Sequence, residues 1–195
     1  AGAKAFSFRG KTVDPFAAPE RLTVAEAFAR YAAVDLLASV TGEGEGDRGR
    51  LATEAAKAGV TIAADDTWGD IFSRILVERV DPHLGAERVT ILYEYPMPQA
   101  ALARAKPSDR RVAERFELYA CGVELANAFG ELTDVAEQRA RFDQAMIEQQ
   151  RIHGERYPID EDFIDALGHM PPAAGIALGF DRLVMLATGA ARIDQ

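Results

Sequence analysis

The amino-acid sequence predicts an α+β fold, because segments typical of strands and of amphipathic helices both occur along the chain. The clearest strand signal lies at residues 115–131, where two apolar runs flank the turn 120–122 and predict a β-hairpin. The clearest helix signals are two capping boxes, Thr23-x-x-Glu26 and Thr67-x-x-Asp70, each directly before an apolar-periodic stretch.

Proline and glycine residues mark the ends of the other predicted elements. Gly59 and Gly189 are typical helix stops, and Pro82 and Pro96 end a helix and a strand. The predicted strands are 4–13 (a strand or hairpin), 90–95, the two arms of 115–131, and 174–178. The predicted helices are 24–33, 50–58, 68–80, 134–153, 161–167 and 180–188.

Composition excludes several classes of protein. The 195 residues are 48% hydrophobic and 27% charged, which is typical of a globular protein with one sizeable core. A formal charge of -9 argues against tight non-specific binding to nucleic acid, because the surface repels phosphate backbones. The single cysteine cannot form an internal disulfide and fits a reducing cytoplasm. No apolar run is long enough to span a bilayer, so we expect no membrane association.

The hairpin at 115–131 carries the first candidate site. A two-residue loop of Ala120 and Cys121 would place Glu117 directly opposite Glu124, with their Cβ atoms about 5 Å apart. Two facing carboxylates repel each other unless a cation lies between them, and oxygen ligands suit magnesium. Asn127 and Glu131 follow on the same strand, adding an amide and a third carboxylate.

Two other interpretations of the hairpin stay open. Exposed hairpins often carry glutamate without any functional role. A bulge at Gly122 would shift the register by one residue and place Glu117 and Glu124 on opposite faces.

The second candidate site is the strand-to-helix turn at residues 174–188. Asp181 in the first turn of the helix complements the helix dipole, but Arg182 opposes it. An arginine in this place indicates an anion to hold, either a bound phosphate or carboxylate or a carboxylate of the protein itself. Gly175 and Gly179 would let a flat ligand lie on the strand, or would allow close helix packing.

The stretches RFELYACGVELANAFGELTD (115–134) and GIALGFDRLVM (175–185) together resemble the lysine branch of the class II aminoacyl-tRNA synthetases. The second stretch is similar to the third signature motif of that superfamily, and the resemblance extends over about the whole chain. It implies an antiparallel β-sheet flanked by helices. It also implies an enzyme that binds ATP with Mg²⁺ and joins lysine to AMP as an aminoacyl adenylate.

The resemblance implies a role for each matching residue. Glu117 and Glu124 would bind the metal and ATP, and Arg182 would contact the ATP phosphates as the catalytic residue. Glu131 would hold the lysine ammonium. The other implied contacts are Asn127 to ATP and substrate, Gly179 to the nucleotide, and Gly175 and Ala177 to the amino acid.

Two departures refine the expected substrate. Ala177 stands where lysyl-tRNA synthetases have a second glycine, and TILYEYPMPQAALA (90–103) differs from their counterpart. Both features resemble the truncated paralogues that ligate a β-lysine-type amino acid onto a lysine of elongation factor P. The alternatives are a lysyl-tRNA synthetase, with tRNA as acceptor, and a synthetase-like protein that binds ligands without catalysis.

The first and second signature motifs of the superfamily have no match here, and we expect them upstream of residue 1. Residues 1–195 would then be the C-terminal portion of the catalytic domain, unable to form an adenylate alone. Because the first motif forms the dimer interface, the resemblance implies a homodimeric parent protein.

Overall fold

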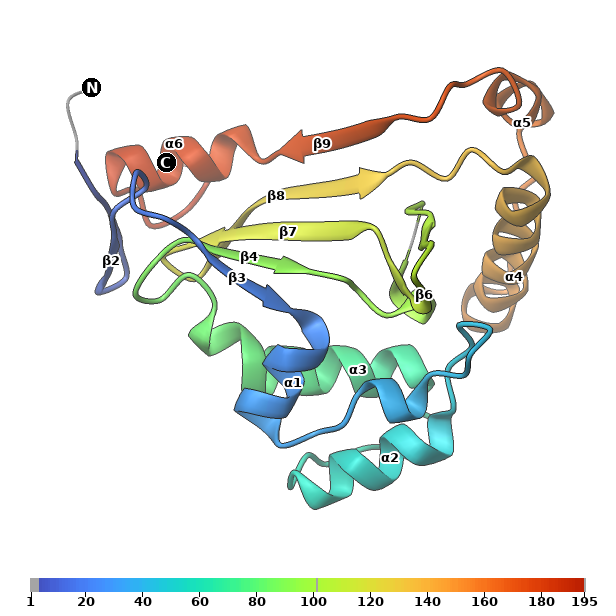
Figure 1. Ribbon diagram of the computed structural model, residues 1–195, viewed down its shortest axis with the longest axis horizontal. Helices are drawn as coiled ribbons and strands as arrows, with labels where there is room; N and C mark the ends of the chain where they lie inside the picture. The colour runs from blue at the N-terminus through green and yellow to red at the C-terminus, as the bar shows by residue number, and fades with distance from the viewer. Residues whose placement is uncertain (1–3, 101, 195) are drawn as a thin grey trace.

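The computed structural model describes residues 4–100 and 102–194. Its centre is a five-stranded sheet in the order β3-β4-β7-β8-β9, drawn in Figure 1. β3 is parallel to β4, and all other neighbours in this sheet are antiparallel. The sheet strands are β3 (Glu20–Thr23), β4 (Thr90–Tyr93), β7 (Arg115–Ala120), β8 (Val123–Gly130) and β9 (Ala174–Leu178).

Two short hairpins and six α-helices surround the sheet within the described residues. The hairpins pair β1 (Phe6–Phe8) with β2 (Lys11–Val13), and β5 (Ala105–Lys106) with β6 (Asp109–Ala113). The helices are α1 (Val24–Ala32), α2 (Arg48–Lys57), α3 (Trp68–Ile75), α4 (Val135–His153), α5 (Glu161–Leu167) and α6 (Phe180–Thr188). A π-turn (Leu76–Val80) and 3₁₀ turns (Leu37–Ser39, Asp81–His83, Met97–Gln99) complete the assignment. The predicted α+β fold with a largely antiparallel sheet is confirmed.

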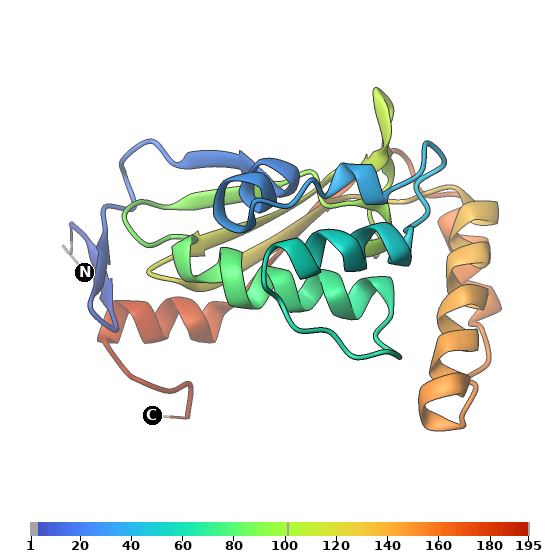
Figure 2. The same cartoon turned by 90° about the horizontal axis from the view of Figure 1, so that it is seen from below.

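Helices cover one face of the sheet. Leu22 and Leu92 on this face pack in one buried cluster with residues of α1, α2 and α3. The rings of Phe28 and Phe72 stack there at 5.0 Å. Figure 2 shows α3 along the lower side of the sheet and α4 standing beyond the end of the sheet. No helix of the described residues is both long and apolar enough to cross a membrane.

The capped helices form where the sequence predicts them. Thr23 and Thr67 each accept the backbone N–H of the third helical residue, and the side chains of Glu26 and Asp70 return to the cap backbone. These reciprocal bonds satisfy the orphan donors of a helix start, and only local sequence is needed to make them.

The register of the β7–β8 hairpin differs from the prediction. The turn residues are Cys121 and Gly122, both with positive φ, and Ala120 pairs with Val123. A bulge then inserts one residue on β8, so Glu117 lies opposite Asn127. The prediction that Glu117 faces Glu124 directly is therefore wrong. The bulge nevertheless keeps them on one face, because Tyr119, two residues after Glu117, lies opposite Glu124.

Gly85 lets the loop before β4 approach the end of β7. Its φ is +60°, and a Cβ built there would lie 2.8 Å from both the Ala120 nitrogen and the Tyr119 carbonyl carbon. We expect Gly85→Ala to lower the free energy of unfolding by about 2–4 kcal/mol, from left-handed strain plus overlap with backbone. Urea unfolding of the purified chain measures this change.

Gly10→Ala is the matched control for Gly85→Ala. Gly10 also has positive φ (+79°), but a Cβ there meets nothing within 4 Å. Only the conformational strain of about 1–2 kcal/mol should remain. Equal losses for the two variants would contradict the close approach at Gly85.

Candidate functional site

The candidate site lies on the helix-covered face of the sheet, which we call the site face. It carries Glu117 on β7, Glu124 and Asn127 on β8, and Ala177 opposite Asn127 on β9. The predicted sharing of one face by Glu117 and Glu124 is consistent with this register, although the two do not lie directly opposite each other. Glu117 is buried, whereas Glu124 and Asn127 are partly exposed.

The start of α6 is fixed to the bulge on β8. The Gly179 N–H donates to the Leu125 carbonyl at 2.8 Å. One Arg182 nitrogen donates to the Glu124 carbonyl at 2.8 Å and to its carboxylate at 3.2 Å. Arg182 therefore has a protein carboxylate as its partner, as one of the two interpretations of the sequence expects. The side chains of Arg182 and Glu124 remain 44% and 34% exposed, so the pair is open to a ligand.

Glu131 lies at the other end of β8, beside β9. A Cβ built at Gly175 would lie 2.5 Å from Glu131 Oε1, so only glycine fits at position 175 with this carboxylate in place. The Glu131 backbone N–H is bonded to the Ala173 carbonyl at 3.0 Å. Within the described residues, its carboxylate has no hydrogen bond or ion pair. A partly buried carboxylate without a partner is suited to a cationic ligand group.

Three protein donors hold Glu117. Arg115 donates to Oε1 at 2.7 Å, and the Asn127 amide nitrogen approaches the same oxygen at 3.4 Å. The Tyr119 hydroxyl donates to Oε2 at 2.6 Å. Arg115 and Tyr119 were not predicted from the sequence, although their spacing of two residues from Glu117 on one strand indicates a shared face.

Asp81, at the start of the 3₁₀ turn after α3, adds a third carboxylate. Burial first, and then the charges of Glu117 and Glu124, together raise the pKa of Asp81 to about 6. Its buried Oδ1 has no hydrogen-bond partner among the described residues. Burial and Glu117 also raise the pKa of the Tyr119 hydroxyl, which therefore stays a donor. The surroundings of these carboxylates favour a cation.

The donor set fits a magnesium ion that arrives with a phosphate ligand. In the described part of the chain, no three histidine, cysteine or acidic residues are grouped to hold a metal by themselves. Mg²⁺ is commonly bound by one or two carboxylates, with substrate phosphates and water completing its octahedron. Glu124 and the remaining lone pairs of Glu117 could provide those carboxylates.

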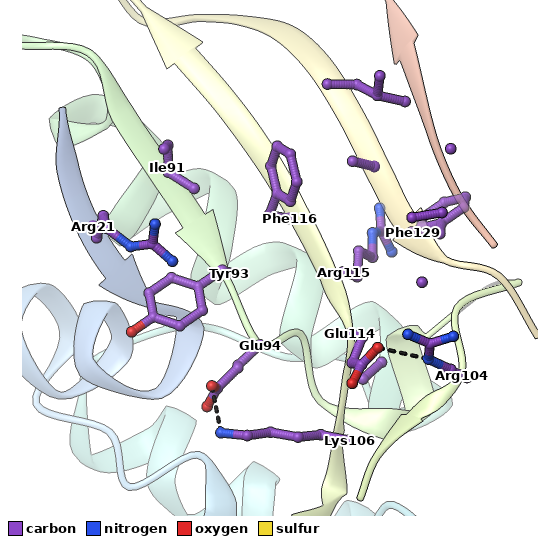
Figure 3. Close-up of a pocket in the computed structure, with 16 residues that line it drawn as sticks. Arg21, Ile91, Tyr93, Glu94, Arg104, Lys106, Glu114, Arg115, Phe116 and Phe129 are labelled. Atoms are coloured by element: carbon purple, nitrogen blue, oxygen red, sulfur yellow. Dashed lines mark hydrogen bonds and ion pairs between the residues drawn. The ribbon is translucent and has the colours of Figure 1, made fainter. Parts of the chain in front are cut away.

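A cavity of about 670 Å³ lies on the opposite face of the sheet, shown in Figure 3. Tyr93 and Phe116 line it, and because Phe116 precedes Glu117 along β7 its side chain points away from the site face. Two ion pairs stand at its edge, Lys106 with Glu94 and Arg104 with Glu114, each at 2.6 Å. Most of its lining therefore lies on the other side of the sheet, with Arg115 and Phe129 also reaching it, and of the predicted site residues only Gly175 on the edge strand lines it.

Comparisons with known proteins identify the relatives of this chain. The family model of the class II tRNA synthetases (D, K and N) matches residues 11–195. The chain is 42% identical over 181 residues to an elongation factor P--(R)-beta-lysine ligase of Proteus mirabilis, covering 91% of this chain and 54% of that protein. The ligase of the same name from Klebsiella pneumoniae is 40% identical over 179 residues, covering 90% and 53%. The chain thus spans about half the length of the curated relatives it matches.

The raised pKa of Asp81 predicts a pH-dependent effect of its removal. Because the folded pKa lies above the ordinary value of 3.8, ionising Asp81 opposes folding. This cost is absent below pH 4 and complete above about pH 6. Asp81→Asn should therefore raise the free energy of unfolding at pH 7.5 by on the order of 1 kcal/mol, allowing for solvent screening. Urea unfolding at pH 7.5 and pH 3.5 measures the difference, which should vanish at the lower pH.

Asp109→Asn is the control, because removing this carboxylate should change the free energy of unfolding in the opposite direction. The Arg111 guanidinium lowers the pKa of Asp109, so its charge favours folding and its removal should not stabilise the chain. A gain in stability for Asp81→Asn of equal size at both pH values would contradict the electrostatic interpretation.

Proposed function

Because the chain belongs to the class II tRNA synthetases (D, K and N), we propose that it is part of an ATP-dependent ligase that activates lysine or β-lysine and transfers it to a lysine of elongation factor P. The names of the relatives support the acceptor. We also propose that residues 1–195 are the C-terminal portion of the catalytic domain, and that the full-length protein is a cytoplasmic homodimer. The span of about half the relatives' length supports a portion of a longer protein, and the resemblance of residues 175–185 to the third signature motif is the reason for placing it at the C-terminal side.

The observation that carries the proposal is the Glu131 carboxylate, which has no partner within the described residues and lies on the same sheet as Glu117 and the Glu124–Arg182 pair. Glu131 lies beside Gly175, and Ala177 is two residues further along β9. An amino acid lying on β9 could place its side-chain ammonium at Glu131 and its carboxylate toward Arg182. The Ala177 methyl lies between these two ends, and a methyl-sized change is worth about 1–3 kcal/mol of discrimination.

When bound, MgATP would supply the electrophilic α-phosphorus and the leaving group. The chain's own residues would bind and orient. Glu124 and Glu117 would bind the metal, and Arg182 would exchange its Glu124 partner for phosphate oxygens and offset their negative charge. Glu131 would hold the ammonium group. No side chain needs to act as a nucleophile, because the substrate carboxylate provides the attacking oxygen.

The test is an exchange assay on the full-length protein that carries these residues. We expect pyrophosphate to exchange into ATP only when lysine or β-lysine is present. Transfer to elongation factor P, with tRNA as the competing acceptor, then identifies the second substrate. Transfer to tRNA alone would favour a lysyl-tRNA synthetase, and ATP binding without exchange would favour a non-catalytic protein.

Glu131→Gln and Glu124→Gln form a matched pair of variants. Glu131→Gln should raise the KM for the amino acid by about 10–100-fold with little change for ATP, since it removes one charge-assisted contact. Glu124→Gln should weaken MgATP more than the amino acid. Exchange kinetics measure both constants, and equal losses for both ligands in both variants would refute these assignments.

Arg182→Lys should lower kcat/KM for exchange by about 10–100-fold, because a point charge does not replace the planar guanidinium fork. Arg192→Lys is the control, since Arg192 forms an exposed pair with Asp194 just after α6. The control should keep the activity of the unmodified protein. Full activity in Arg182→Lys would contradict the proposed contact between Arg182 and the phosphates.

A further inference from the structure

Arg115, on β7, is the most enclosed guanidinium among the ion pairs of the described residues, with its side chain 15% exposed. The Tyr95 ring lies 4.3 Å from its Cζ, and the Phe129 ring lies at 5.5 Å. Its three nitrogens point at three different groups: the Gln99 carbonyl at 2.6 Å, Glu117 at 2.7 Å and the Asn127 side-chain oxygen at 3.3 Å.

The contact between Arg115 and Asn127 fixes which end of the amide faces which partner. A guanidinium only donates hydrogen bonds, so the amide atom facing Arg115 Nε must be the oxygen. The reverse orientation would place an NH₂ group against an N–H and would lose the bond. The Asn127 nitrogen consequently points along the site face, where its contact with Glu117 is long, at 3.4 Å.

Stability alone gives a weak reason for this arrangement. Enclosing a charged pair costs desolvation that its attraction rarely exceeds by much, so such pairs seldom contribute large net stability. Orientation is a stronger reason, because the planar fork holds both Glu117 and Asn127 in set directions. Tyr119 fixes the second oxygen of Glu117 in the same way.

We propose that Arg115 is a positioning residue that presents Asn127 to the ligand as a hydrogen-bond donor. The inference rests on the proposed function and extends it, because it assigns the chemistry that Asn127 recognises. A donor at this position selects an acceptor, such as a carboxylate or phosphate oxygen, and disfavours an ammonium group. Lysine at position 115 cannot reproduce the effect, since one ammonium cannot satisfy three partners in the guanidinium plane.

The first test is Arg115→Lys in the full-length protein. We expect a loss of about 10–100-fold in kcat/KM for amino-acid-dependent exchange, the size typical when the support of a ligand-binding residue is removed. Arg74→Lys is the control, since Arg74 pairs with Asp66 at 3.1 Å and contacts none of the site residues. Thermal unfolding of both variants should be similar, which separates positioning from general destabilisation.

The second test asks whether Arg115 acts through Asn127. In an Asn127→Ser background, Arg115→Lys should cost at least fivefold less than in the unmodified protein. Asn127→Asp keeps an acceptor for Arg115 but removes the donor, so it should be at least as damaging as Asn127→Ser. The inference would be overturned if the fold-losses of Arg115→Lys and Asn127→Ser multiply fully in the double variant. It would also be overturned if Asn127→Asp had the kinetics of the unmodified protein.

Measurements of MgATP binding test the role of Arg115 separately from the proposed function. If the unmodified protein catalyses no exchange with lysine or β-lysine, the proposed activity fails, but calorimetry with MgATP still tests Arg115. We expect Arg115→Lys to weaken MgATP by about tenfold and Arg74→Lys to leave it unchanged. Equal affinities for the unmodified protein and Arg115→Lys would overturn the positioning role.

Discussion

The site depends on one irregularity in the pairing of β7 with β8. If the register set at the turn continued along β7 and β8 without a bulge, Glu124 would stay on the site face but Asn127 would point to the other side. If the register at the opposite end of the two strands continued without a bulge, Asn127 would stay opposite Glu117 but Glu124 would point to the other face of the sheet. The single extra residue near Leu125 allows both side chains to share the face with Glu117. A one-residue insertion therefore decides whether the polar groups meet.

The backbone groups freed by the bulge hold the last helix. The Leu125 carbonyl accepts the Gly179 N–H, and the Glu124 carbonyl accepts a bond from Arg182. Buried or half-buried carbonyls need partners, so the bulge and the start of α6 stabilise each other. This mutual dependence explains why a cation occupies the first turn of a helix, where the dipole disfavours it.

The sequence predicted the elements better than their register. Caps such as Thr23 with Glu26 and the hairpin around residues 115–131 are local features, and the structure confirms them. The bulge could not be predicted in the same way, because the groups that stabilise it come from Gly179 and Arg182, more than 50 residues later. The predicted opposition of Glu117 and Glu124 was wrong for that reason. Asp81 was missed because it comes from a separate segment with no periodicity that relates it to the hairpin.

The distribution of charge on the site face means that its two ends favour different ligand groups. Burial, together with the charges of Glu117 and Glu124, raises the pKa of Asp81 to about 6, so this end repels a bare anion. A phosphate chain can approach there only with a cation of its own and with a guanidinium available, which Arg182 provides at the surface. Glu131 at the other end has no competing cation within the described residues, so it favours an ammonium group directly. Under the proposed function, a substrate with one cationic and one anionic end would therefore have a single favourable direction along β9, which would bring its carboxylate to the phosphate end.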